Sequence, residues 1–111
     1  MSMDQEQQLL DQIKKEIASN PIVLFVKGTR EMPRCGFSAR TIALFEEFGK
    51  PFKVIDILPD PRLRQVLSAH SNWPTIPQVF IKGKFVGGCD IVTEMHQEGE
   101  LRKLVEDAFP S

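Results

Sequence analysis

The chain has 111 residues, of which 41% are hydrophobic and 26% are charged, as is typical of a folded globular protein. We expect a single domain over residues 1–111, because this length leaves no room for a second core. The 14 basic and 15 acidic side chains give a formal net charge of −1. This balance provides no overall attraction to nucleic acid or to an anionic membrane, so we expect neither as a partner.

Targeting and redox features favour a reducing compartment. No apolar run approaches the roughly 20 residues that span a bilayer, and the acidic, polar residues 1–8 do not resemble a secretory signal. A secreted disulfide scaffold of this size usually has more cysteines than the two found here, Cys35 and Cys89. We expect a cytoplasmic protein, although a processed organellar protein would show the same pattern.

The first part of the chain predicts a helix followed by a strand. Apolar residues recur at helical spacing over 9–17, with Asp4 as the expected N-cap, and Pro21 ends the helix. Residues 22–26 form a continuous apolar run rich in β-branched side chains, which is typical of a strand buried on both faces.

A second helix and a second strand are predicted next. After a polar loop over 27–34, a helix begins near Cys35, and its apolar side chains share one face as far as Phe48. We expect Gly49 to follow the C-cap of this helix. Residues 52–57 then read as a strand that runs parallel to the first, because a helix connects the two.

The third helix and a hairpin complete the predicted sheet. Asp60 and Pro61 are suited to the N-cap and first position of the third helix. Residues 78–81 and 85–86 flank a Lys-Gly-Lys turn and predict an antiparallel hairpin.

A final helical region is expected from about residue 91 to residue 109, with Asp90 as its cap and a break near Gly99. The predicted order is helix–strand–helix–strand–helix–strand–strand–helix, an α/β protein with one mixed sheet.

The motif Cys35-Gly36-Phe37-Ser38 is a C-x-x-C redox motif in which oxygen replaces the second sulfur. Its position at a helix N-terminus favours the thiolate and lowers the pKa from roughly 8.5. A thiolate is both a nucleophile and a metal ligand, so Cys35 is the candidate catalytic residue and the candidate metal ligand. Ser38 can donate a hydrogen bond to the sulfur but cannot form a disulfide. The plainer alternative is a buried structural cysteine.

Several spaced motifs give the chain a resemblance to a known family. Over about residues 5 to 108 it resembles the monothiol glutaredoxins. The motifs that carry the resemblance are Lys27-Gly28-Thr29, Cys35-Gly36-Phe37-Ser38, Trp73-Pro74-Thr75-Ile76-Pro77-Gln78 and Gly87-Gly88-Cys89-Asp90. The resemblance implies the thioredoxin fold, a four-stranded mixed sheet flanked by helices, with an extra N-terminal helix.

The resemblance also implies a cofactor and a ligand. A [2Fe-2S] cluster is expected at a homodimer interface, where each subunit gives Cys35 and one bound glutathione gives a second sulfur. This count satisfies the four ligands that such a cluster needs.

By the same resemblance, five residues are expected to bind glutathione. Lys27 and Arg64 would pair with its glycine carboxylate. The backbone of Ile76, which precedes a cis bond to Pro77, would pair with its cysteinyl part. The N–H of Cys89 and the carboxylate of Asp90 would take the γ-glutamyl end. The residues in this set are Lys27, Arg64, Ile76, Cys89 and Asp90.

Other residues near these motifs have less specific interpretations. Cys89 is either an inert small residue or the partner of Cys35 in a disulfide. Phe37 is expected to form a hydrophobic wall at the site, and Trp73 is expected to pack. His70 and His96 have no partner at metal-ligand spacing, so both are interpreted as surface or packing residues.

Three functions remain open at this stage. The first is a carrier that delivers the cluster to apo iron–sulfur proteins, with weak or no oxidoreductase activity. The second is a glutathione-dependent thiol–disulfide oxidoreductase with Cys35 as the nucleophile. By resemblance, the loop before Cys35 argues against high activity of that kind. The third is an adaptor that shares a cluster with a BolA-like protein.

Overall fold

The computed structural model describes residues 2–110, and side chains from Asp4 to Pro110. A four-stranded sheet has the spatial order β2-β1-β3-β4. Its strands are β1 (Ile22–Val26), β2 (Lys53–Asp56), β3 (Gln78–Ile81) and β4 (Lys84–Gly87). The helices are α1 (Ser2–Ser19), α2 (Gly36–Glu46), α3 (Pro61–Ser71), α4 (Cys89–Gln97) and α5 (Glu100–Ala108).

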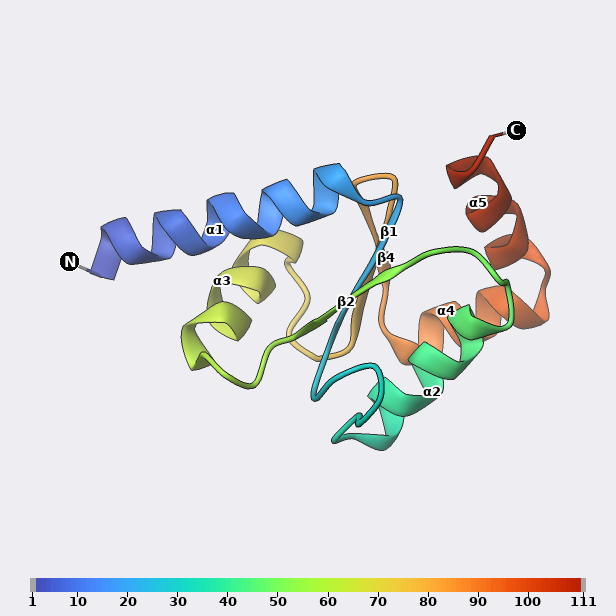
Figure 1. Ribbon diagram of the computed structural model, residues 1–111, viewed down its shortest axis with the longest axis horizontal. Helices are drawn as coiled ribbons and strands as arrows, with labels where there is room; N and C mark the ends of the chain where they lie inside the picture. The colour runs from blue at the N-terminus through green and yellow to red at the C-terminus, as the bar shows by residue number, and fades with distance from the viewer. Residues whose placement is uncertain (1, 111) are drawn as a thin grey trace.

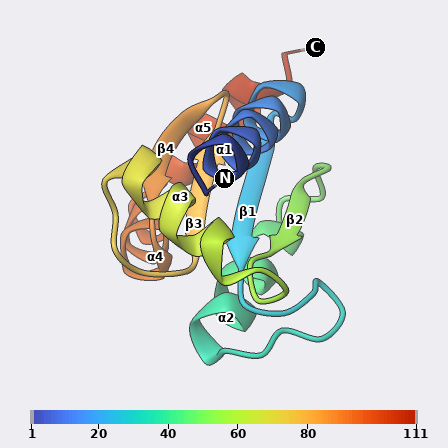
Figure 2. The ribbon, with the colours of Figure 1, turned by 90° about the vertical axis from the view of Figure 1, so that its left-hand side faces the viewer.

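The sheet is mixed, as the connections predicted. Strand β1 pairs with β2 in parallel and with β3 antiparallel, and β3 pairs with β4 as an antiparallel hairpin. Helices α1 and α3 cover one face of this sheet, and α2, α4 and α5 cover the other (Figure 1). Figure 2 shows α1 and α3 in front of the strands. This is the thioredoxin fold with an additional N-terminal helix.

Strand β1 contributes to the core on both faces, as its uninterrupted apolar run predicted. Alternate side chains point to opposite faces of a strand. Ile22, Leu24 and Val26 therefore pack with α2, α4 and α5, whereas Val23 and Phe25 pack with α1 and α3. All five are at most 1% exposed. The strand is thus fixed from both sides, and the loop that follows it starts from a rigid position.

Two predicted N-caps are corrected by the structure. Helix α1 begins at Ser2, so Asp4 lies inside its first turn. Helix α4 begins at Cys89 with the extended residue Gly88 as its N-cap, so Asp90 also lies inside the first turn. A carboxylate in the first turn is favourable beside the helix dipole, and this accounts for acidic residues there without a capping role.

Other predicted boundaries agree within a few residues. Asp60 is the N-cap of α3, and its carboxylate accepts a hydrogen bond from the N–H of Arg62 at 3.0 Å. The final helical region divides into α4 and α5 at Gly99, which has a φ of +82°. Helix α2 ends at Glu46, earlier than predicted, and a turn continues to Gly49 with a φ of +66°.

Within residues 2–110, we find no helix that is both long enough and apolar enough to cross a membrane.

Candidate functional site

Cys35 is the N-cap of α2, where the chain turns from the loop after β1 into the helix. Its side chain is half-buried. The pKa of the Cys35 thiol is lowered, chiefly by the backbone N–H of Ser38, against an opposing effect of partial burial. The N–H of Phe37, the charge of Lys27 and the Ser38 hydroxyl lower this pKa further. The prediction of a stabilised thiolate is therefore confirmed.

Ser38 is fully buried, at 0% exposure, and its hydroxyl accepts a hydrogen bond from the backbone N–H of Lys27 at 3.1 Å. This hydroxyl also contributes to the lowered pKa of Cys35, as the smallest of the effects. The contact with Lys27 was not predicted. It joins the end of β1 to the first turn of α2, next to the reactive sulfur.

A groove of about 440 Å³ lies beside Cys35. All six site residues expected from the sequence line it: Lys27, Cys35, Arg64, Ile76, Cys89 and Asp90. They come from the loop after β1, the start of α2, α3, the segment before β3 and the start of α4. Residues far apart in the sequence therefore meet at one end of the sheet.

Apolar and aromatic side chains form further walls of the groove. Phe37 lines it and is 56% exposed, as expected for a wall rather than a core residue. Trp73 also lines the groove and packs against Phe85, with ring centroids 5.5 Å apart. The expectation that Trp73 packs is thus correct, and it contacts the groove as well. The Ile76–Pro77 peptide bond is cis, as the resemblance implied.

The segment before β3 is shaped by a side chain that sequence reasoning missed. Gln78 is 0% exposed, and its amide nitrogen donates to the carbonyl oxygens of Trp73 at 3.0 Å and Thr75 at 3.2 Å. A polar residue at the start of an otherwise apolar strand was the available signal. Arg64 donates to the carbonyl oxygen of Pro74 at 3.4 Å, so α3 also contacts this segment.

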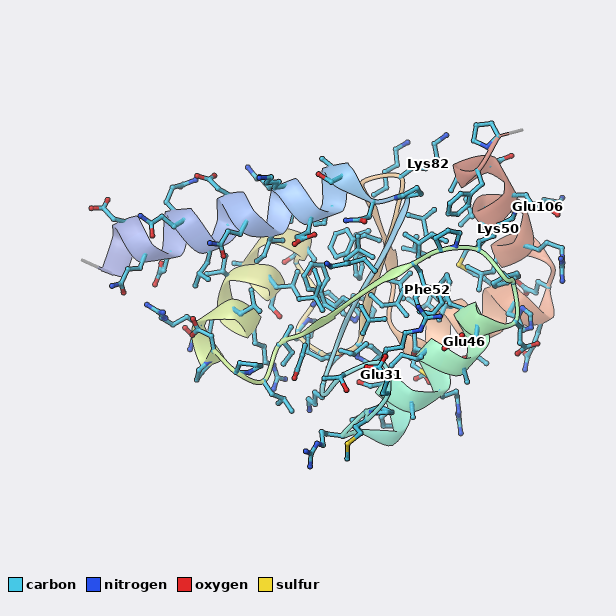
Figure 3. All side chains as sticks on the ribbon, viewed as in Figure 1. Glu31, Glu46, Lys50, Phe52, Lys82 and Glu106 are labelled. Carbon is cyan, nitrogen blue, oxygen red and sulfur yellow. The ribbon has the colours of Figure 1, made fainter. Side chains whose placement is uncertain are left out.

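The loop before Cys35 is attached to α2 and to the residue before β2. The guanidinium of Arg30 makes two hydrogen bonds to the Glu46 carboxylate, at 3.0 and 2.9 Å. It also lies 4.0 Å from the ring centroid of Phe52. Figure 3 labels Glu46 and Phe52 on the α2 side of the sheet. Arg30 therefore connects the loop before Cys35 to both α2 and the residue before β2.

Cys89 has a different environment from Cys35. It is 6% exposed, its sulfur lies 3.9 Å from the Thr93 hydroxyl, and both thiols are free. Among the described residues there is no group of three His, Cys, Asp or Glu side chains arranged for a metal ion. His70 stacks on Phe80 and His96 packs against Phe48, in agreement with their interpretation as packing or surface residues.

The fold and site together define a thioredoxin-fold thiol protein with one accessible motif cysteine beside a groove. The glutaredoxin family model matches residues 22–86. The chain is 49% identical to Glutaredoxin 4 of Pasteurella multocida, over 88% of this chain and 90% of that protein. It is 44% identical to a monothiol glutaredoxin of Synechocystis, over 89% of this chain and 92% of that protein.

A comparison with solved structures also finds a glutaredoxin. The chain superimposes on a buckwheat glutaredoxin–glutathione complex with a TM-score of 0.85 and 30% identity, over 95% of this chain and 94% of that one. The chain therefore belongs to the glutaredoxin family, as a monothiol member.

Proposed function

We propose that this protein binds a [2Fe-2S] cluster together with glutathione and passes the cluster to apo iron–sulfur proteins. One observation carries the proposal: Cys35, a half-buried cysteine with a lowered pKa, lies at the edge of a groove with cationic and helix N-terminal groups. A thiolate in that position is available to a cargo that arrives from outside the chain.

The groove has the chemistry that glutathione requires. Glutathione carries two carboxylates, one amine and one thiol. In this proposal Lys27 and Arg64 pair with the glycine carboxylate, and the backbone of Ile76 pairs with the cysteinyl part. The N-terminus of α4 at Cys89 takes the second carboxylate, and Asp90 takes the amine. A related buckwheat glutaredoxin was solved in complex with glutathione, which supports glutathione as the ligand of this groove.

Counting sulfur ligands supports a cluster shared between two chains. A [2Fe-2S] cluster takes four ligands, usually thiolates. Cys89 is buried, so one chain offers one accessible thiolate, Cys35. In the proposed complex two chains supply two sulfurs, and two glutathione molecules supply the others. Such a cluster is cargo held at an exposed edge, and a recipient thiol can replace glutathione there.

The cysteines also bear on the cellular compartment and the partners that we propose. Two free cysteines suit a reducing compartment, and we propose the cytoplasm. Apo iron–sulfur proteins are the proposed recipients, and a BolA-like protein is a proposed partner in a mixed complex.

Anaerobic reconstitution tests the proposal directly. Iron, sulfide and glutathione are added to the reduced protein, and visible absorbance and elution volume are followed together. Cluster absorbance should appear only when glutathione is present, and the protein that carries it should elute at the volume of a dimer. Cys35→Ser should lose it, whereas the matched variant Cys89→Ser should keep it. Full cluster content in Cys35→Ser would contradict the proposal.

The lowered pKa of Cys35 favours one alternative, a glutathione-dependent thiol–disulfide oxidoreductase. In that reaction the Cys35 thiolate attacks a glutathione mixed disulfide and releases the substrate thiol. A second glutathione thiolate then attacks the Cys35–glutathione disulfide and releases glutathione disulfide. Rapid turnover of a glutathionylated peptide by the cluster-free protein would favour this alternative over the carrier.

A further inference from the structure

The backbone around Lys27 is hydrogen-bonded to three separate parts of the chain. Its N–H donates to the Ser38 hydroxyl at 3.1 Å, and its carbonyl oxygen accepts from the N–H of Arg34 at 2.8 Å. The next N–H, that of Gly28, donates to Asp56 Oδ1 at 2.9 Å. Lys27 directly follows β1, so these bonds hold the backbone in place for two residues beyond the end of the strand.

Asp56 serves two segments with one oxygen atom. It is the last residue of β2 and lies opposite Val26 in the parallel pairing with β1. Its Oδ1 accepts from Gly28 and also from the N–H of Leu58, both at 2.9 Å. The carboxylate therefore joins the two loops that leave neighbouring parallel strands. Hydrogen bonds to an ionised acceptor are stronger than those between neutral groups.

The bond to Asp56 is made by the N–H of Gly28, which lies in the peptide plane that follows Lys27. The φ of Gly28 is +98°, and a Cβ atom there would lie 2.6 Å from the Met32 carbonyl oxygen and 2.6 Å from the Arg34 nitrogen. Glycine is the residue with the least restricted backbone rotation, so outside contacts must restrict it. Asp56 supplies one such contact. The Gly28 N–H belongs to the Lys27–Gly28 peptide plane, so its bond to Asp56 fixes the ψ angle of Lys27 and with it the direction in which the Lys27 side chain leaves the backbone.

We propose that Asp56 is a positioning residue that directs Lys27 into the glutathione groove. The inference rests on the proposed function, in which Lys27 pairs with a carboxylate of glutathione. Asp56 does not line the groove, and it borders a separate hollow together with Gly28 and Leu58. Its effect on ligand binding therefore passes through the backbone of Gly28 and not through contact with the ligand.

A double-mutant cycle tests this inference in the reduced, cluster-free full chain. Reduced glutathione is titrated by NMR into the wild type, Asp56→Ala, Lys27→Ala and the double variant. Asp56→Ala should raise the dissociation constant about fivefold, the loss expected for one hydrogen bond. In the Lys27→Ala background the same change should have almost no further effect, because the positioned group is absent.

Two control variants separate positioning from charge and from stability. Asp56→Asn keeps an acceptor oxygen, so it should restore affinity to within about twofold of the wild type. Asp107→Ala removes an exposed carboxylate from α5 and should leave the dissociation constant unchanged. If Asp56→Ala does not fold, Asp56→Ser takes its place in the cycle.

The possible results have distinct meanings. A lower melting temperature of Asp56→Ala with an unchanged dissociation constant would overturn the inference and leave the proposed function intact. Independent, multiplying effects of Asp56→Ala and Lys27→Ala would also overturn it. If Lys27→Ala binds glutathione as well as the wild type does, the proposed ligand role of Lys27 and the inference fail together.

Discussion

The hydroxyl of Ser38 accepts a hydrogen bond from the backbone N–H of Lys27 at 3.1 Å, across 11 positions of the sequence. The last residue of the C-x-x-S motif therefore links the end of β1 to the start of α2. Ser38 is fully buried, so water does not compete for this donor. The serine has a structural role of its own beside Cys35 and does more than occupy the place of a second thiol.

Replacing Ser38 should destabilise the fold. Ser38→Ala removes the acceptor and leaves the Lys27 N–H without its partner, at a cost of about 1–2 kcal/mol. Urea denaturation followed by circular dichroism measures the loss. Ser19→Ala, at an exposed position near the end of α1, is the matched control and should change stability little. Equal midpoints for Ser38→Ala and the wild type would show that this bond contributes nothing.

The lowered pKa of Cys35 predicts a reactive thiolate near neutral pH. The alkylation rate of Cys35, measured in a Cys89→Ala background, should rise with pH and level off below the usual range for cysteine. Lys27→Gln should move the inflection upward only in part, because the N–H of Ser38 is the largest cause of the shift. An inflection in the wild type as high as in the urea-unfolded chain would contradict the site described above.

Two glycines near the site should respond in opposite ways to alanine. At Gly28, a φ of +98° and backbone atoms 2.6 Å from the new Cβ predict a loss of at least about 2 kcal/mol. At Gly36, the first residue of α2, a Cβ meets nothing within 4 Å. Gly36→Ala should therefore be neutral or stabilise by up to about 1 kcal/mol. Chemical denaturation of both variants makes the comparison, and similar losses would contradict it.

The ion pair between Arg30 and Glu46 should stabilise the protein only above acidic pH. Arg30 lowers the pKa of the Glu46 carboxyl, so the folded state favours the ionised form. That contribution is complete above the ordinary carboxyl pKa and is lost as the pH falls through the lowered value in the folded state.

Thermal denaturation of Glu46→Gln measures this contribution. The variant should melt slightly below the wild type at about pH 7 and together with it at about pH 2. Glu98→Gln, at an exposed position, is the matched control and should melt at the same temperature as the wild type at both pH values. A deficit of Glu46→Gln that persists in acid would exclude the ion pair as its cause.

Local sequence patterns predicted much of the fold. The apolar run of β1, the Asp60 cap and the break at Gly99 were all correct, because each depends on neighbouring residues. The proposed caps Asp4 and Asp90 were wrong. An acidic residue is favourable both as an N-cap and in the first helical turn, and composition alone does not distinguish the two positions.

The site was predictable from the sequence where residue types carry chemistry, but not where a particular side-chain-to-backbone hydrogen bond shapes the site. Cys35 and its expected neighbours line one groove, as the motifs indicated. The roles of Gln78 and Asp56 were missed. Gln78 binds carbonyl groups of the nearby residues Trp73 and Thr75, and Asp56 binds the N–H of the distant residue Gly28. Neither contact leaves a periodic pattern in the sequence.

Native mass spectrometry of the anaerobically reconstituted protein tests the central claim most directly. The proposed complex predicts one species that contains two chains, one [2Fe-2S] cluster and two glutathione molecules. Cys35→Ser should give only cluster-free chains under the same conditions, and Cys89→Ser should give the same species as the wild type. A cluster bound to a single chain, or to two chains without glutathione, would contradict the shared ligand set.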